Sequence, residues 1–357
     1  MSDQQTACPT ANPAPKPGTP ADATTGPAPR GTARTRAASP ARVILVLLAL
    51  VATLATLSML MGPAGIGVPS QAAWLILVEI RLPRTLLALL VGGGLGLAGA
   101  VLQGYLRNPL AEPGLIGIAS GAGLGAVLAI HTGAASAFAL ALPFGGLAGA
   151  GLAMLAVLLL AGPRGGGLSL ILAGVAVSSL AAALISGVLA LSRNPFAAVE
   201  IIFWLLGSLA DRSLVHVWLA APFIVAGMAL LLAQGPALDA MTLGEDVATN
   251  LGIAPERTRL AVVTGATLVV GAATAVAGTI GFVGLVVPHL LRPLVGQMPS
   301  RLLPASLLGG AAMLLAADLA VRLVTPAGEL RLGVVTALIG TPFFLWLVAR
   351  TRRELAP

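Results

Sequence analysis

Charged residues are scarce in this chain of 357 residues, because aspartate, glutamate, lysine and arginine together make up only 9% of it. A soluble domain contains roughly 25%. Hydrophobic residues make up 57%, and the mean hydropathy is +0.97. A bilayer offers no water to exposed backbone groups, so only helices or closed barrels span it, and the alternation typical of barrel strands is absent. The composition therefore predicts an all-α polytopic membrane protein.

Cysteine is also nearly absent. The single cysteine, Cys8, excludes a disulfide framework and a thiolate metal site, and no long apolar stretch precedes it, so a lipoprotein anchor is not expected. Two of the three histidines, His131 and His289, have no second ligand at a useful spacing. We therefore expect no metal site in this chain.

The motifs of the common enzymes are missing as well. The chain has no G-x-x-x-x-G-K-[ST], no G-x-S-x-G and no H-E-x-x-H, and its glycine-rich stretch 162–167 lacks the lysine of a phosphate-binding loop. We expect neither an enzyme nor a cofactor in this chain. The net charge of +7 is spread over loops and the tail without interleaved aromatics, so nucleic-acid binding is not expected either.

Residues 1–41 are rich in Pro, Ala, Thr and Gly, a composition that cannot bury a core, and we expect a disordered cytoplasmic tail. Apolar runs of about 20 residues follow, each long enough to span a bilayer. The run at 281–297 is interrupted by glycines and a proline, and should be short or broken. The ten predicted spans are 43–61, 84–106, 113–131, 138–161, 168–192, 214–234, 258–277, 281–297, 302–325 and 332–350.

Basic residues set the predicted orientation, because cytoplasmic loops carry an excess of them. With ten spans and an inside N-terminus, 14 of the 20 basic residues lie in the cytoplasm, against six outside. We therefore expect a multi-pass protein of the bacterial cytoplasmic (inner) membrane with both termini in the cytoplasm.

Small residues recur at helical spacing. Gly92 and Gly96 lead one such series, and Gly121 and Gly125 belong to another, which predicts close helix contacts. Ala98-Gly99 also precedes Pro109 by the distance that separates Ala277-Gly278 from Pro288. This weak match predicts an inverted repeat of spans 2–5 and 7–10.

One polar island, 236–259, separates the sixth and seventh spans. Thr242 and Glu245 have the spacing of a capping box, which predicts the start of a short helix, and Gly252 followed by Pro255 predicts its end.

Leu243, Val247 and Leu251 recur every fourth residue on this predicted helix and form an apolar stripe. Periodicity leaves two alternatives open. The stripe could pack on the chain's own bundle, or it could dock a partner.

Five stretches along the chain carry distinctive combinations of glycine, proline and arginine. They are RLPRTLLALLVGGGLGLAGAVLQGYLRNPLAEPGLIGIASGAGLG (81–125), FWLLGSL (203–209), LGEDVATNLGI (243–253), GTIGFVGLVVPHLLRPLVG (278–296) and ELRLGVVTALIGTPFFLWL (329–347). In this order they resemble the iron-chelate and vitamin B12 permeases of bacterial ABC importers, the FecCD-type family. The chain departs from the family at 296–301, where an Asp-His pair is usual, and at Arg331, where proline is common.

The resemblance implies that 42–353 form a transmembrane permease domain of about ten helices that works as a homodimer. It also implies that 236–257 form a cytoplasmic coupling loop, which docks in a groove of a separate cytoplasmic ABC ATPase dimer that binds the ATP. The ATPase-coupling residues would be Leu243, Gly244, Glu245, Val247, Ala248, Leu251 and Gly252.

On the outer face, the resemblance implies docking of a periplasmic or lipid-anchored substrate-binding protein. Arg81, Arg84 and Arg322 match the family's docking arginines. Contact with membrane lipid headgroups is the alternative. Arg193 and Arg212 also lie outside and have no counterpart in that match.

Several residues are candidates for lining a transport pathway: Gln103, Asn108, Ser178, Ser179, Pro288 and His289. Polar groups in membrane segments usually face a cavity or a partner. Interhelical hydrogen bonding is the preferred alternative for Gln103, Asn108 and His289. Asp318 lies four residues before Arg322, which predicts an ion pair within one helix.

Two functions from different classes remain. The first is the permease subunit of an ATP-driven importer of an iron chelate such as a ferric siderophore, with haem or cobalamin as alternative substrates. The second is a secondary transporter, which should carry buried carboxylates for a coupling ion. Only Asp318 could serve in that role, so the first function is favoured.

Overall fold

The computed structural model describes residues 39–62, 65–66, 73–138, 140–162, 165–324 and 330–355. Residues 1–38, and with them nearly all of the predicted tail, lie outside this part of the chain. The secondary-structure elements of the described residues are helices, apart from a two-residue pairing of β1 with β2. The elements are α1 (Pro40–Leu60), β1 (Met61–Gly62), β2 (Gly65–Ile66), α2 (Ala73–Leu75), η1 (Ile76–Arg81), α3 (Leu82–Tyr105), η2 (Pro113–Ile116), α4 (Ile118–His131), α5 (Ala134–Ala137), α6 (Ala141–Ala161), α7 (Gly167–Leu191), α8 (Pro195–Leu205), α9 (Leu214–Leu232), α10 (Gly235–Met241), α11 (Glu245–Asn250), α12 (Pro255–Ala277), α13 (Val283–Val295), α14 (Pro299–Val324) and α15 (Leu332–Leu355).

Eight of the described helices are long and apolar enough to cross a membrane, and α4, α8 and α13 are shorter apolar helices. Each of the ten predicted spans overlaps one long or shorter apolar helix, and α4 and α13 supply the third and eighth. The eighth is short, as expected, because 278–282 form an irregular segment before α13. The prediction of an all-α polytopic membrane protein is confirmed.

Helix α8 was not among the predicted spans, although its start carries a capping signal. Asn194 accepts a hydrogen bond from the backbone of Phe196 at 3.0 Å, and Pro195 occupies the first helical position. At 11 residues, α8 is too short for a criterion based on span length.

Helices α3 and α12 form the centre of the bundle. In their most apolar windows, 83% and 78% of residues are buried, against 17% for α1 and 22% for α15. Glycines permit this packing, since a Cβ on Gly96 would collide with the backbone of α14, and one on Gly99 with Gly284 of α13. Gly121 and Gly125 likewise meet the backbone of α6. The small residues therefore serve helix packing, as their spacing predicted.

The helix contacts follow the pattern expected of the repeat. Helix α3 packs on α14, and its predicted counterpart α12 packs on α6. Helix α4 packs on α6 and α7, and its counterpart α13 packs on α14 and α15.

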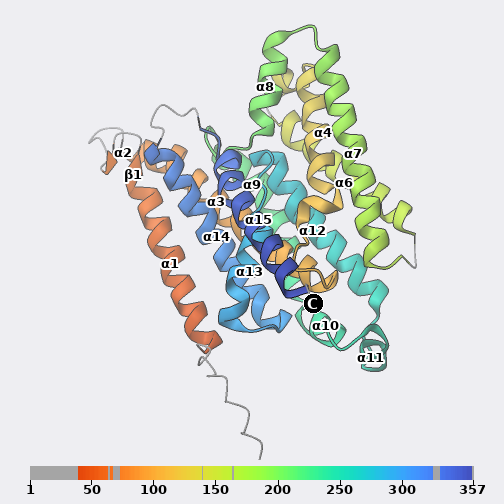
Figure 1. The fold of residues 1–357 in the computed structure, drawn as a ribbon. Helices are drawn as coiled ribbons and strands as arrows, with labels where there is room; N and C mark the ends of the chain where they lie inside the picture. The colour runs from red at the N-terminus through yellow and green to blue at the C-terminus, as the bar shows by residue number, and fades with distance from the viewer. Residues whose placement is uncertain are drawn as a thin grey trace, which may run out of the picture. The chain divides into compact units, whose positions relative to one another are not determined.

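The first turn of α1, the short helices α10 and α11, and the last turns of α15 lie at the same end of the bundle (Figure 1). Strand β1 and helices α2 and α8 lie at the opposite end (Figure 1). We call these the α11 end and the α8 end.

Candidate coupling surface and polar clusters

The polar island forms two short helices rather than one. Helix α10 ends at Met241 and α11 begins at Glu245, with Gly244 as its N-cap at φ +117°. The predicted capping box is therefore wrong, because the Thr242 hydroxyl donates to the carbonyl of Asp239 at 2.7 Å. The chain turns at Gly244, and a glycine is suited to this position because other residues rarely adopt this φ.

The predicted end of the helix is confirmed. Gly252 lies at φ +85°, and its N–H donates to the carbonyl of Thr249 at 2.9 Å. The N–H of Ile253 donates to the carbonyl of Ala248 at 3.0 Å. These two bonds form a Schellman motif, which satisfies the last carbonyls of α11.

The apolar stripe is exposed. Leu243 is 66% exposed, Val247 42% and Leu251 62%, whereas Ala248 of α11 is fully buried. The alternative in which the stripe packs on its own bundle is therefore wrong. Ala248, a predicted coupling residue, instead packs α11 onto this chain. We call Leu243, Val247 and Leu251 the coupling stripe.

Helix α10, which precedes the coupling stripe, is attached to the bundle by hydrogen bonds and buried side chains. The N–H of Ser300, in the first turn of α14, donates to the Asp239 carboxylate at 2.9 Å. Arg107, which follows α3, donates to the carbonyl of Met241. Leu238 and Met241 are buried. Helix α10 is thus fixed to the ends of α3 and α14.

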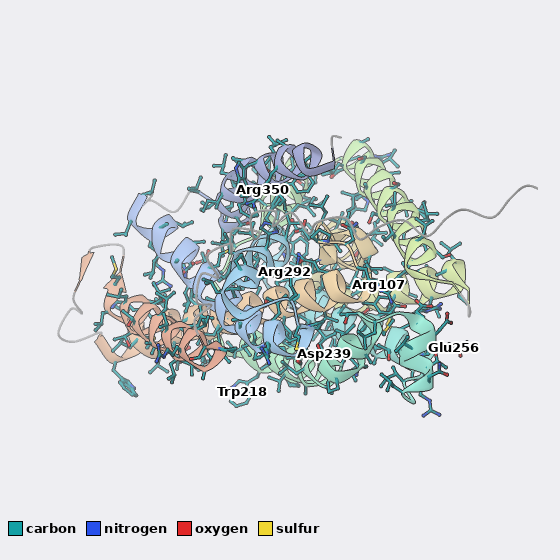
Figure 2. The ribbon with its side chains drawn as sticks, turned by 60° about the horizontal axis from the view of Figure 1, so that its bottom comes forward. Arg107, Trp218, Asp239, Glu256, Arg292 and Arg350 are labelled. Carbon is teal, nitrogen blue, oxygen red and sulfur yellow. The ribbon has the colours of Figure 1, made fainter. Side chains whose placement is uncertain are left out.

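A groove of about 660 Å³ lies beside α11. Its wall includes Glu245, Glu256 and Arg257. Arg259 closes one side, because its guanidinium donates to the carbonyls of Gly162 and Gly165 at 2.6 and 2.7 Å. Figure 2 brings the α11 end forward and shows Asp239 and Glu256 there, together with Arg107, Arg292 and Arg350.

The three outer arginines form a cluster with Asp318 at the α8 end. Arg84 binds both carboxylate oxygens of Asp318, with Nε–O distances of 2.8 and 3.1 Å. Arg322 binds the same carboxylate at 2.6 Å, which confirms the predicted ion pair within α14. Asp318 is only 1% exposed, so the carboxylate is committed to these two cations.

The same arginines hold the last turn of α1. Arg81 donates to the carbonyls of Met59 and Leu60, both at 2.9 Å. Arg322 donates to the carbonyl of Ser58 at 2.9 Å and to its hydroxyl at 3.1 Å. Arg81 and Arg322 are buried. We call Arg81, Arg84, Asp318 and Arg322, with Ser58, the outer clamp.

Gln103 makes the interhelical bonds that were the preferred alternative. It is buried, donates to the carbonyls of Gly284 and Leu285 at 3.3 Å, and accepts from Arg292 at 2.9 Å. Asn108 caps a turn, accepting from the N–H of Leu110 at 2.9 Å.

The other pathway candidates belong to α7 and α13. Ser178 is half-buried and Ser179 is exposed on α7. Pro288 is buried in α13, and the ring of His289 meets Phe343 of α15 edge-on at 5.5 Å.

Sequence reasoning missed Glu112. Its carboxylate accepts a hydrogen bond from the N–H of Phe282, which lies at φ +67° where the chain breaks before α13. It also lines a mostly apolar cavity of about 740 Å³, together with Leu206, Thr279 and Gly333. In the sequence, Glu112 stands in a predicted loop before Pro113, where an acidic residue indicates no particular role. Its role is visible only from its hydrogen-bond partner, which lies 170 residues away in the sequence. No group of three or more His, Cys, Asp or Glu side chains among the described residues could hold a metal ion.

Known proteins resemble this chain over most of its length. It is 43% identical over 296 residues to the ferric enterobactin transport system permease protein FepD of Escherichia coli, covering 80% of this chain and 86% of that protein. It is 40% identical over 288 residues to the cobalamin import system permease protein BtuC of Halobacterium salinarum, covering 80% and 76%. The hemin transport system permease protein HmuU of Yersinia pestis is 37% identical over 289 residues, covering 80% and 86%.

A solved structure has the same fold. It is an ABC transporter assigned to the metal-chelate type, in an inward-facing conformation. The TM-score is 0.80 at 34% sequence identity, and the match covers 87% of this chain and 99% of that one. The model of the FecCD transport family matches residues 41–350. This chain is therefore a member of the FecCD transport family.

Proposed function

We propose that this chain is the transmembrane permease subunit of an ABC importer that moves a ferric siderophore across the bacterial cytoplasmic membrane. A separate ATPase dimer supplies the energy, and a substrate-binding protein delivers the chelate at the α8 end. The α11 end and both termini then lie in the cytoplasm. Haem and cobalamin are the alternative substrates, because HmuU and BtuC are named for them.

The observation that carries this proposal is the coupling stripe. Three large apolar side chains are exposed on α11 and beside its two ends, and the neighbouring helix α10 is held by α3 and α14. Exposed apolar side chains on a fixed scaffold are typical of a protein-docking surface. The secondary-transporter alternative gives them no partner. That alternative also needs a free carboxylate for a coupling ion, but Asp318 is already paired with Arg84 and Arg322.

The test of coupling places a charge on the stripe. We expect Leu251→Asp, and Leu243→Asp as a second case, to abolish co-purification with the ATPase subunit. A carboxylate buried at that interface without a partner costs several kcal/mol. Asn250→Asp is the matched control, since it adds the same charge to α11 beside the stripe. Unchanged co-purification of both leucine variants would show that the stripe does not dock the ATPase.

We further propose that two copies of the chain form the transport path. The α7 helices, near Ser178–Ser192, and the broken segment 278–288 would border it. Irregular backbone at membrane depth is tolerated where protein or water covers it, and 278–282 line the large cavity. Single cysteines in both stretches, on a Cys8→Ser background, should react with a membrane-impermeant reagent. Uniform protection with and without nucleotide would argue against this path.

The substrate is tested by growth. A deletion strain should fail to grow on one ferric siderophore as sole iron source, and the wild-type gene should restore growth. Loss of growth on haem alone, or a cobalamin requirement, would assign one of the alternatives instead.

A further inference from the structure

Two arginines outside the outer clamp lie on neighbouring segments at the α8 end. Arg212 belongs to the connection between α8 and α9, and Arg331 immediately precedes α15. Backbone bonds join these segments, because the N–H of Gly333 donates to the carbonyl of Gly207 at 3.3 Å. The N–H of Ser208 donates in turn to the carbonyl of Ala277 at 2.7 Å. The position of the two arginines is thus set by the backbone around them.

Both arginines keep an unsatisfied nitrogen within the described part of the chain, although the Asp211 carboxylate lies next to Arg212 in the sequence. The Nε atoms of Arg212 and Arg331 are buried and have no hydrogen-bond partner there, and neither guanidinium lies in an ion pair. Arg331 instead rests over the ring of Phe203, 5.0 Å from its centroid. A buried donor without an acceptor is costly. Both side chains are only half-buried, so an anion from outside the chain would meet the other nitrogens of the two guanidinium groups.

The electrostatics point the same way. Burial lowers the pKa of Arg212, the Asp211 carboxylate raises it, and the positive charge of Arg331 lowers it again. Arginine nevertheless remains protonated in proteins. Nearby His216 is not an available acceptor, because its Nδ1 already pairs with Ser213 in the N-terminal turn of α9. The positive charges of Arg212 and Arg331 therefore lie near each other in a partly buried environment.

We propose that Arg212 and Arg331 form an entry subsite for a carboxylate-bearing anionic chelate. The cavity of about 740 Å³ lies behind the same segments, since Leu206, Gly333 and Val334 line it. Within its lining, the Glu112 carboxylate is engaged by the N–H of Phe282. Guanidinium groups bind carboxylates through two parallel hydrogen bonds, which orients the ligand as well as holding it. This inference rests on the proposed import function and specifies its substrate class.

The titration with ferric citrate needs neither the ATPase nor the binding protein, so its failure leaves the import function standing. The full-length chain is purified in lipid nanodiscs and titrated with ferric citrate, while sodium chloride of equal ionic strength serves as the salt control. Ferric citrate should raise the unfolding temperature of the wild type. In Arg212→Gln and Arg331→Gln the concentration giving half of this effect should rise about tenfold or more, because a charge-assisted hydrogen bond is lost.

Arg193→Gln is the matched control, because Arg193 is an exposed arginine in the connection before α8. It should titrate like the wild type. A second measurement uses only the wild type: ferric citrate should protect Arg212 and Arg331, but not Arg193, from phenylglyoxal as read by mass spectrometry.

Two results would overturn the proposal. One is equal stabilisation of all variants together with no protection of Arg212 and Arg331. The other is an unchanged ferric citrate titration in variants that have lost salt-sensitive affinity for the binding protein, which would assign the two arginines to a protein carboxylate instead.

Discussion

Asp318 is the residue on which the outer clamp depends. It is 1% exposed and faces two guanidinium groups, from Arg84 and Arg322, while Arg81 holds α1 close by. The spacing of four residues predicted the pair with Arg322. The pair with Arg84 could not be predicted, because 234 residues separate the partners and only the packing of α3 on α14 brings them together.

We predict that Asp318→Asn lowers the free energy of unfolding by about 3–5 kcal/mol, because removing one partner leaves buried charge uncompensated. Thermal unfolding in detergent measures this. Asp246→Asn on exposed α11 is the control, and should change stability by about 0.5 kcal/mol at most. In Asp318→Asn/Arg84→Gln the loss should be partly restored, and strictly additive effects would argue against a shared network.

The outer clamp also affects how docking of the binding protein can be tested, because its arginines stabilise the fold as well. Arg81, Arg84 and Arg322 remain proposed docking residues, but each already donates to a group in this chain. We predict that Arg81→Glu/Arg84→Glu lowers both the unfolding temperature and the affinity for the binding protein. If docking is direct, the remaining affinity per folded complex should lose its dependence on salt. An affinity that stays salt-sensitive would assign these arginines to the clamp alone.

At the scale of the helix, glycine decides how closely the elements approach. The spacing of Gly92 and Gly96 predicted a contact face on α3, although it could not say that this face meets α14 or that Gly99 meets α13. The break at Gly244 was missed for a related reason. The Thr242–Glu245 spacing fits a helix start, and only the positive φ of Gly244 makes it a turn.

We predict that Gly99→Ala destabilises the protein by about 1–3 kcal/mol, the usual range for overpacking. The added methyl would overlap the backbone of Gly284, which cannot move without shifting α13. Gly151→Ala is the matched control, since nothing lies within 4 Å of the position its Cβ would take. Equal unfolding temperatures for the two variants would contradict this packing.

At the scale of the described bundle, the ten spans and their order were predictable, because hydropathy and length are read directly from sequence. The contact that joins the two predicted repeat halves at the irregular segment 278–282 was not predictable. Glu112 of the first half accepts from the N–H of Phe282 in the second, and nothing near either residue in the sequence indicates the other.

We predict that Glu112→Ala slows ATP-driven uptake about fivefold or more, because it leaves a partly buried N–H without its charged acceptor at a cost of about 1–3 kcal/mol. Glu112→Gln keeps a carbonyl acceptor and should lose less. The measurement is uptake per folded complex in proteoliposomes. Wild-type rates in Glu112→Ala would show that this bond does not matter for transport.

The attachment of α10 has a mechanical consequence. Helices α3 and α14, of 24 and 26 residues, are rods of about 36–39 Å at 1.5 Å per residue. They lie against each other at Gly92 and Gly310. One end of each rod is tied to α10, through Arg107 and Ser300. Near the other end, Arg84 on α3 and Arg322 on α14 hold the same carboxylate. A force on α11 would therefore act on α3 and α14 together. Because the two helices are joined near both ends, a displacement at the α11 end would be passed on to the α8 end.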